Sequence, residues 1–277
     1  MRVTGRSTFL VPALLLVAVA AGAQQRPLVT EDPEPIGAGR WAIEAGADWT
    51  ADRFYPAAGL TGDLLRLPLV GLSVGLGAIG ELQIDGGFYN RLAISDRQDA
   101  PFAGDLDFTG DTTSDVEDFV VATKVRIVAE RAGRPAFGVR FATRLPNASS
   151  RSGLGLDTTD FLATLLVGKT VHAFRLAGNA GIGILGNPLR ADSQNDVVAG
   201  GASLTRALTS RVELVSEVEG RVHVRHEAAP PGTGSRGAVR VGGRYRSGAG
   251  RFDVAVVFGL TSSDGDWGIT GGYSRFF

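Results

Sequence analysis

The sequence contains no cysteine, one methionine at position 1 and three histidines. The missing cysteine excludes disulfides, thiolate catalysis and cysteine-based metal sites. Long hydrophobic runs are missing after residue 23, since no stretch approaches the roughly 20 apolar residues that a membrane-spanning helix needs. The formal net charge of −1 gives no basic excess that would point to nucleic acid as a partner. What remains is a glycine-rich chain of 277 residues, long enough for one large domain or two average ones.

The first 23 residues have the parts of a secretory signal. Arg2 and Arg6 form a positive n-region, residues 9–21 form an apolar h-region, and Ala21-Gly22-Ala23 supplies the small side chains before a cleavage site. The alternative, a transmembrane anchor, would need a longer run than these roughly 13 apolar residues. We therefore predict that residues 1–23 are a cleaved signal peptide, and the absence of cysteine excludes a lipoprotein.

The rest of the chain alternates between apolar and polar residues with a period of two. In residues 211–226, RVELVSEVEGRVHVRH, every second residue from Val212 is apolar or small, and nearly all those between are charged or polar. This alternation predicts a β-strand with one apolar face and one charged face. Such patterns predict twelve strands, at 39–50, 66–77, 81–95, 116–130, 135–145, 158–171, 173–186, 196–206, 210–226, 237–247, 251–262 and 266–277.

The connections between the predicted strands alternate in length. Those after even-numbered strands are short, as at 78–80 and 247–250, whereas most of the others are longer and polar, as at 51–65 and 96–115. This rhythm is typical of an up-and-down antiparallel β-barrel in an outer membrane, with short periplasmic turns and longer extracellular loops. We therefore predict that residues 39–277 form an all-β transmembrane barrel of about twelve strands in the outer membrane of a Gram-negative bacterium.

The two faces of each strand predict what it touches. In a transmembrane barrel the apolar face meets lipid and lipopolysaccharide, and the charged face lines the lumen. The predicted lumen-lining residues are Arg40, Glu44, Asp85, Arg91, Lys124, Arg126, Arg140, Arg144, Asp160, Asn179, Glu213, Glu217, Glu219, Arg221, His223, Arg225, Arg240, Arg244 and Arg246. The aromatic residues predicted to lie at the membrane interfaces are Trp41, Trp49, Tyr245, Trp267, Tyr273 and Phe277.

The last strand, WGITGGYSRFF, ends in an aromatic residue. A terminal aromatic on an amphipathic strand resembles the assembly signal of bacterial outer-membrane barrels, so the barrel-assembly machinery is a predicted partner through Phe277. Arg275 departs from that signal, where an apolar or aromatic residue is usual. We expect its side chain to extend toward the periplasmic interface.

Five stretches carry short motifs that occur together in one bacterial family. They are a TED segment followed by a strand with Glu44, the pair Thr123-Lys124, a Leu-Pro before a glycine-rich loop at 138–160, Asn179, and either Glu217 or Glu219. Together they resemble the outer-membrane transporter family named for the meta-pathway of phenol degradation. Asn147 departs from the family pattern, in which Thr follows the Leu-Pro. The resemblance implies a barrel of about twelve strands that acts as a transporter, with Glu44 and Asn179 facing inward.

Three functions are compatible with these features. The first is a porin-like channel for the passive passage of small solutes, either hydrophobic, aromatic or anionic, in which residues 24–38 either plug the lumen or lie in the periplasm. The second is a closed structural or surface-interaction barrel with a salt-bridged lumen. The third, a barrel lipid hydrolase, would need His223 beside a hydroxyl nucleophile and an orienting group. We predict no enzyme, and no catalytic residue, metal or cofactor.

Two further motifs have simpler interpretations. The stretch GLGAIG at 75–80 matches a dinucleotide fingerprint, but an alternating segment follows where that site needs a helix, so we predict a tight hairpin. Residues 99–118 are rich in aspartate, which either forms a solvated outer loop or binds a cation such as Ca²⁺.

Overall fold

The computed structural model describes residues 26–277, and the signal peptide predicted at 1–23 lies outside them. No helix in the described part of the chain is long and apolar enough to cross a membrane. Residues 26–277 contain fourteen β-strands and a single 3₁₀ turn, Ser150–Ser152. The strands are β1 (Trp41–Tyr55), β2 (Leu60–Leu76), β3 (Gly80–Gly87), β4 (Asn90–Arg97), β5 (Thr112–Asp115), β6 (Val120–Val128), β7 (Ala136–Arg144), β8 (Asp160–Val171), β9 (Phe174–Gly186), β10 (Gln194–Ala207), β11 (Val212–His223), β12 (Arg236–Ser247), β13 (Gly250–Gly259) and β14 (Trp267–Phe276).

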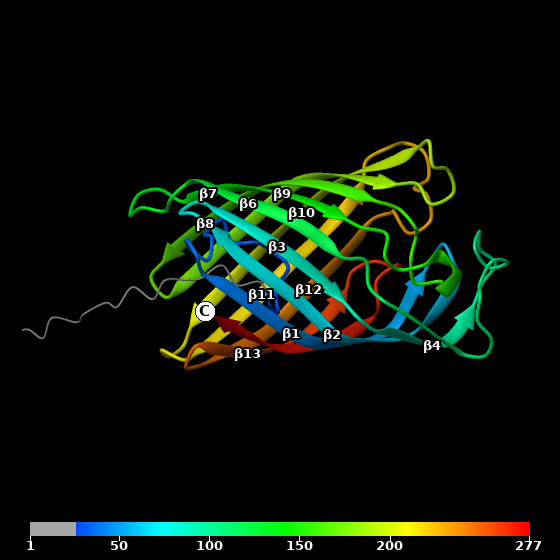
Figure 1. Ribbon diagram of the computed structural model, residues 1–277, viewed down its shortest axis with the longest axis horizontal. Helices are drawn as coiled ribbons and strands as arrows, with labels where there is room; N and C mark the ends of the chain where they lie inside the picture. The colour runs from blue at the N-terminus through cyan, green and yellow to red at the C-terminus, as the bar shows by residue number, and fades with distance from the viewer. Residues whose placement is uncertain (1–25) are drawn as a thin grey trace, which may run out of the picture.

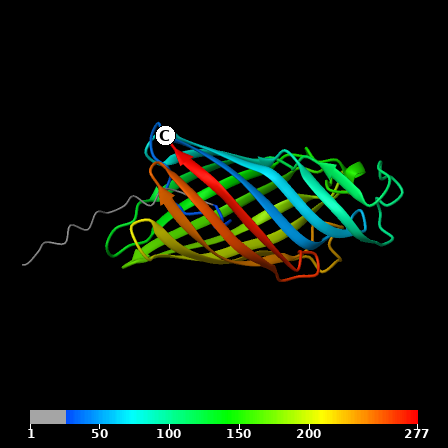
Figure 2. The same ribbon diagram turned by 90° about the horizontal axis from the view of Figure 1, so that it is seen from below.

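All these strands belong to one antiparallel sheet that closes on itself. β1 pairs with β14 on one side and with β2 on the other, which closes the barrel wall. β3 and β4 both pair with β2 and act as one wall strand interrupted at Phe88-Tyr89, and β5 and β6 do the same on the next position. The result is a closed barrel of twelve wall strands, as predicted, with every strand tilted against the long axis (Figures 1 and 2).

The connections distinguish the two ends of the barrel. Tight turns at 77–79, 172–173 and 248–249 lie at the same end as Trp41 and Phe277, and the long connections lie at the other end. By the rule for outer-membrane barrels the first end is periplasmic and the second is the outer end. The glycine-rich stretch at 75–80 is one of the tight turns, as predicted, since Gly77 takes a φ of +76° between β2 and β3.

One predicted long connection is wrong. Residues 51–65 continue as strand rather than loop, because β1 runs on to Tyr55 and β2 begins at Leu60. The turn between them is therefore short, and at the outer end β4 runs alongside β2 from Leu60 to Arg66. The predicted stretch contains Leu60 and Leu64, which are buried there, and this burial supports the extended hairpin.

The outer surface of the wall is apolar. Large side chains with exposed fractions such as 65% for Leu165, 60% for Ile182 and 57% for Phe141 point away from the barrel. Exposure of this much contiguous apolar surface to water would be unfavourable by roughly 25 cal/mol per Å², whereas lipid accommodates it. The belt and the closed barrel together place the chain in an outer membrane.

Aromatic residues border this belt at two levels. At the periplasmic end the ring of Trp41 stacks on Phe277 with 4.3 Å between centroids. Toward the outer end Trp49 meets Trp267 edge to face at 5.0 Å. The two levels are about 26 Å apart along β1 at roughly 3.3 Å per residue, and about 20 Å apart along the barrel axis once a strand tilt of roughly 40° is taken into account.

The remaining predicted interface aromatics and the C-terminus lie at the periplasmic level. Tyr273 packs on Phe252 at 4.8 Å between centroids, and Tyr245 stands opposite Phe252 across the β12–β13 pair. Arg275 lies on the outer surface with its guanidinium 5.3 Å from the ring centroid of Phe277. This position agrees with an arginine that reaches along the apolar surface toward the interface.

The arrangement of apolar residues inverts at the outer end. Ala58, Leu60, Leu64 and Leu92 form a buried cluster inside the barrel, and side chains from β1, β4 and the outer loops pack against it. The covering residues are Tyr55, Ile94, Leu106, Phe108 and Leu154. This part of the molecule buries its apolar residues as a water-soluble domain does.

This inversion corrects one predicted lumen residue. Arg91 is exposed between the buried Asn90 and Leu92 in β4, so it points away from the interior. The physical reason is the interruption at Phe88-Tyr89, which changes the phase of the alternation between β3 and β4.

Candidate functional site

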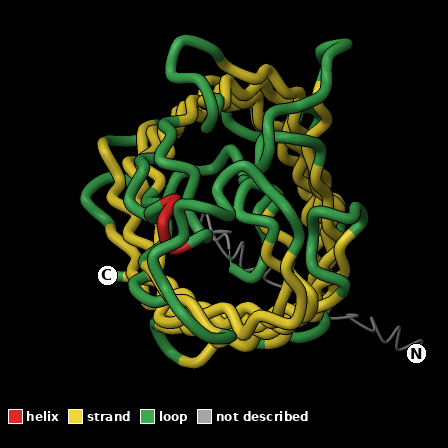
Figure 3. Tube along the Cα trace, turned by 90° about the vertical axis from the view of Figure 1, so that its right-hand side faces the viewer, coloured by secondary structure: helices red, strands yellow, loops and turns green. Residues whose placement is uncertain are grey.

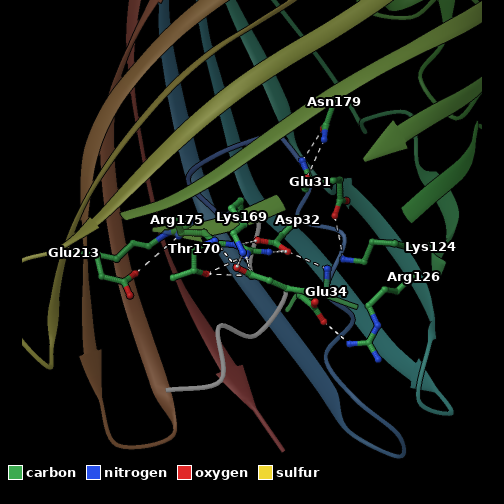
Figure 4. A network of polar contacts seen from close by, with 12 residues as sticks. Glu31, Asp32, Glu34, Lys124, Arg126, Lys169, Thr170, Arg175, Asn179 and Glu213 are labelled. Atoms are coloured by element: carbon green, nitrogen blue, oxygen red, sulfur yellow. Dashed lines mark hydrogen bonds and ion pairs between the residues drawn. The ribbon is translucent and has the colours of Figure 1, made fainter. Parts of the chain in front are cut away.

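The interior of the barrel holds the segment that precedes β1. Residues 26–36 lie within the lumen and make hydrogen bonds or ion pairs with residues from most of the wall strands (Figure 4). The segment has no strand partner of its own, so its backbone N–H groups are bound by wall side chains. The chain then leaves at the periplasmic end, where Gly39 N–H donates to the Gly75 carbonyl at 3.1 Å and β1 begins.

Lys124 is almost completely buried in this arrangement, with 1% of its surface exposed. Its Nζ lies 3.2 Å from Glu31 of the segment and 3.3 Å from Glu81 of β3. Glu31 also pairs with Arg140 of β7 at 3.1 Å, and Glu81 accepts a hydrogen bond from the Ile36 N–H at 2.8 Å. Each buried charge therefore has an opposite partner, which is the condition under which charges are tolerated away from water.

A second group of ion pairs holds the segment near the periplasmic turns. Asp32 accepts two hydrogen bonds of 2.6 Å from the Arg175 guanidinium, a bidentate contact (Figure 4). Arg175 also pairs with Glu130, and Glu34 pairs with Arg126 of β6. These contacts fix the segment against β6 and β9.

Backbone groups of the segment are bound by two wall residues. The Glu217 carboxylate accepts from the N–H of Val29, at 2.9 Å, and from the N–H of Thr30. Asn179 pairs with Glu31 through both of its amide atoms, accepting from the Glu31 N–H at 2.7 Å and donating to its carbonyl at 2.9 Å. Glu217 and Asn179 thus replace the strand partners that this backbone lacks.

Arg26, the first described residue, is bound by residues of β12, β13 and β14. Arg244 and Arg251 both donate to the carbonyl oxygen of Arg26 at 3.0 Å. The Arg26 guanidinium donates to the Gly271 carbonyl at 2.8 Å and lies 3.6 Å from Asp253. With the contacts above, the segment is bound on several sides of the lumen.

Neighbouring wall strands also pair their charges directly. On β11 and β12, Glu217 meets Arg240 at 2.8 Å and Glu219 meets the same arginine at 3.1 Å. Glu213 meets Arg246 at 2.6 Å and Arg244 at 3.9 Å. The glutamate row and the arginine row predicted on these strands therefore face each other.

Above the segment, toward the outer end, the interior remains open. A cavity of about 720 Å³ lies there, and residues 26–31 of the segment line part of it. Viewed from the outer end, the ring of strands encloses loops that cross its opening (Figure 3). Apolar side chains such as Tyr55, Leu64 and Leu156 share the cavity wall with charged ones. The size is within the range of small-molecule sites.

The charges that line this cavity are unequal in number. Among the described residues, eight arginines and six carboxylates line it. All six carboxylates are in ion pairs with arginine or lysine, as in the contacts of Asp264 with Arg53 at 3.5 Å and of Asp118 with Arg144 at 2.7 Å. Two of the eight arginines, Arg221 and Arg236, form no ion pair with the described part of the chain.

Most of the predicted lumen residues face the interior or line the cavity in this structure. Three are placed otherwise, and Arg91 is one of them. Arg40 precedes β1 and is exposed at the periplasmic rim, and Arg225 follows the end of β11, is 46% exposed and pairs with Asp196 at 2.5 Å. His223 is the last residue of β11, with ring nitrogens 2.7 Å from Asn195 Oδ1 and 2.6 Å from the Glu227 carbonyl. The hydroxyl contact that a hydrolase would need is not made by this ring.

Several lumenal charges were not among the predicted residues. Glu31, Asp32 and Glu34 belong to a segment without periodicity, so no alternation indicated which way they point. Glu81, Arg175, Arg236 and Arg251 lie at the starts of strands. For these four, continuing the alternation of each strand to its first residues would have found the inward position.

The acidic stretch at 99–118 is not one loop. Residues 112–115 form β5, and Glu117 and Asp118 turn inward to pair with Arg66 at 2.9 Å and Arg144 at 2.7 Å. Asp99, Asp105 and Asp111 stay exposed. Within residues 26–277, no group of three acidic or histidine side chains is arranged to hold a metal ion.

The fold is similar to solved outer-membrane proteins. With the COG4313 outer membrane channel from Pseudomonas putida F1 the TM-score is 0.62 at 14% identity, over 89% of this chain and 98% of that one. With the NanC porin it is 0.52 at 9% identity, over 85% and 98%. No protein-family model and no curated protein matches the sequence. At these identities the likeness establishes the fold, an outer-membrane barrel with the architecture of channels and porins.

Proposed function

We propose that this protein is an outer-membrane channel for the passive passage of small solutes, and that the lumenal segment, residues 26–36, restricts its bore. The likeness to channels and the short motifs shared with the phenol meta-pathway transporters support the channel. The solute path would run from the outer cavity past the segment to the periplasm. No energy source or cofactor is needed for such passage.

The observation that carries this proposal is the combination of an open, polar cavity with a segment that has no backbone-to-backbone hydrogen bonds to the described wall strands. A segment bound through ion pairs and single hydrogen bonds is easier to displace than a strand of the wall, where each residue contributes ladder hydrogen bonds. Rings of fixed charge set the selectivity of pores. The excess of arginine over carboxylate around the cavity would favour anions over cations.

The test is single-channel conductance of the refolded protein in a planar bilayer, with two variants. One lacks residues 26–38. The other keeps the full length but carries Glu31→Gln, Asp32→Asn and Glu34→Gln, which removes three of the carboxylates that bind the wall. A matched control carries the same three charge changes at Asp99, Asp105 and Asp107, which lie in the exposed outer stretch.

We expect low conductance for the wild type and the control, and a several-fold higher conductance for both segment variants. Equal conductance in all four proteins would mean that the segment does not restrict the pore. If none of them conducts, although each inserts as a folded barrel, the channel proposal fails.

A second function is favoured by one specific observation, the near-complete pairing of charges in the periplasmic half of the lumen. A fully paired interior is also what a closed barrel requires, with the outer loops performing an interaction role. The same recordings separate the two functions, because a closed barrel would give no conductance with or without the segment.

A further inference from the structure

The outer cavity contains a pair of arginines that the rest of the interior leaves without carboxylate partners. Arg221 of β11 and Arg236 of β12 are directly opposite each other across the strand pair. Side chains at such positions lie on the same face with Cβ atoms roughly 5 Å apart, and like charges there are unfavourable. The wall thus holds two positive charges together at a place where each nearby carboxylate already forms an ion pair with another arginine.

The carboxylates near this pair are bound to other arginines. Glu219, two residues from Arg221 on β11, pairs with Arg240 at 3.1 Å. Asp264 pairs with Arg53 at 3.5 Å and also accepts from the Gly237 N–H at 2.9 Å. The positive charge of the pair is therefore balanced by neither of them.

The position of Arg221 is fixed by the loop that joins β11 to β12. Its Nε and one terminal nitrogen donate to the carbonyls of Gly234 and Gly232 at 3.1 and 3.0 Å. Gly232 has a φ of +81°, and a Cβ added there would come within 3.0 Å of Leu156. The guanidinium is thus held in place, and its second terminal nitrogen makes no hydrogen bond with the described residues.

Arg236 differs from Arg221 because it makes no side-chain hydrogen bond or ion pair with residues 26–277. It lines the same cavity and is half-buried. One oriented guanidinium and one adjustable guanidinium can bind the two oxygens of one carboxylate, since arginine matches the planar geometry of that group. Leu156 lies next to this position and would meet an apolar part of the same molecule.

We propose that Arg221 and Arg236 form a binding site for the carboxylate of a small organic acid with an apolar body, which enters the cavity from the outside. This site rests on the proposed channel function and gives it a solute class. The cavity of about 720 Å³ has room for such a molecule beside Leu156 and Leu154. Binding would remove the repulsion between the two arginines, and it would be weakened by salt.

The test is calorimetric titration of the refolded full-length barrel in a low-salt, uncharged detergent, with hexanoate, 1-hexanol and inorganic phosphate as probes. The variant is Arg221→Gln with Arg236→Gln. The matched control is Arg190→Gln with Arg225→Gln, which removes the same charge from the exposed outer loops. Arg236→Gln alone serves if the double variant does not fold, because this side chain has no partner to lose.

We expect saturable hexanoate binding that is at least tenfold weaker in the double variant and within twofold of wild type in the control. Hexanol should show no saturable binding, and phosphate should compete with hexanoate only weakly. Unchanged hexanoate affinity in the double variant would overturn the site. Phosphate binding as tight as that of hexanoate would overturn the apolar part of the proposal.

Reversal potentials of the same variants in bilayers separate this site from the channel function. A barrel that conducts but shows no loss of anion preference in the double variant, together with unchanged hexanoate binding, is a channel without this site. A barrel that binds hexanoate through the two arginines but never conducts keeps the site and refutes the channel.

Discussion

The periplasmic and outer halves of the barrel interior differ in how completely their charged side chains are paired. In the periplasmic half, Lys124 and Glu81 are almost completely buried and each is paired with an opposite charge. In the outer half, Arg221 and Arg236 face a cavity and have no carboxylate partner. A charge without a partner is costly in a dry interior and tolerable beside water. The number of charges therefore says little about function here, and the two arginines without a carboxylate partner beside an open cavity say more.

The largest expected effect on stability comes from the buried charges in the periplasmic half of the interior. Lys124→Met would leave Glu31 and Glu81 without their shared cation, and removing one partner of a buried ion pair costs about 3–5 kcal/mol. We expect a lower midpoint in urea unfolding of the refolded barrel. We also expect higher conductance, since the segment loses a central contact.

The matched control for that substitution is Lys169→Met. Lys169 pairs with Glu130 at 3.4 Å near the periplasmic turns, but its side chain is 26% exposed. Its Nζ also donates to the turn carbonyls of Arg131 and Ala132 at 2.6 and 2.9 Å. Because a half-buried pair at a turn costs less to break than a fully buried one, this variant should destabilise the barrel less than Lys124→Met and leave the conductance close to wild type. Equal effects of the two substitutions would mean that the deep burial of Lys124 in the lumen adds nothing to its contribution.

A smaller effect is expected where the segment is held by one carboxylate. Glu217→Gln removes the charge that accepts from the backbone of Val29 and Thr30, and hydrogen bonds to charged groups contribute about 1.5–3 kcal/mol. We expect hydrogen exchange at these two amides to be about tenfold faster or more, because roughly 1.4 kcal/mol corresponds to a factor of ten.

Glu219→Gln provides the comparison for that experiment. Glu219 shares Arg240 with Glu217 but contacts no backbone group of the segment. Its substitution should leave the exchange of Val29 and Thr30 within a factor of about two. If both variants speed exchange equally, the segment is held by the net charge of the lumen and not by Glu217 itself.

The sequence predicts which face of each wall strand points into the lumen better than it predicts the contacts made inside the lumen. Strict alternation in β11 is sufficient to place Glu213, Glu217 and Glu219 on one face, because a strand has a fixed period of two. The same rule failed at Arg91, since the interruption at Phe88-Tyr89 reverses the phase and leaves no local mark in the pattern. For the candidate site, the alternation predicted that Arg221 faces the lumen but did not include Arg236. It also could not show that Arg221 lacks a carboxylate partner, because that depends on the ion pairs that its neighbours form in three dimensions.

The contacts of the lumenal segment could not be predicted for a related reason. Residues 26–36 have no periodicity and no partner strand, so their positions follow from the shape and charge of the finished lumen. Asp32 meets Arg175 across 143 positions of sequence, a pairing that local patterns do not encode. From the sequence, residues 24–38 were compatible with a plug in the lumen and with a position in the periplasm.

The smallest predicted effect tests whether the unpaired arginines are kept for function. Arg236→Gln should stabilise the folded barrel by about 0.2–1 kcal/mol, because it removes a like-charge pair across β11 and β12 and breaks no contact with the described chain. Arg240→Gln on the same strand should destabilise it, since Glu217 and Glu219 would lose their partner. Urea unfolding midpoints of the two variants, measured without any added organic acid, decide the matter. A destabilising Arg236→Gln would mean that this arginine supports the fold, and the contrast between the paired charges of the periplasmic half and the unpaired arginines of the outer cavity would then have to be abandoned at this position.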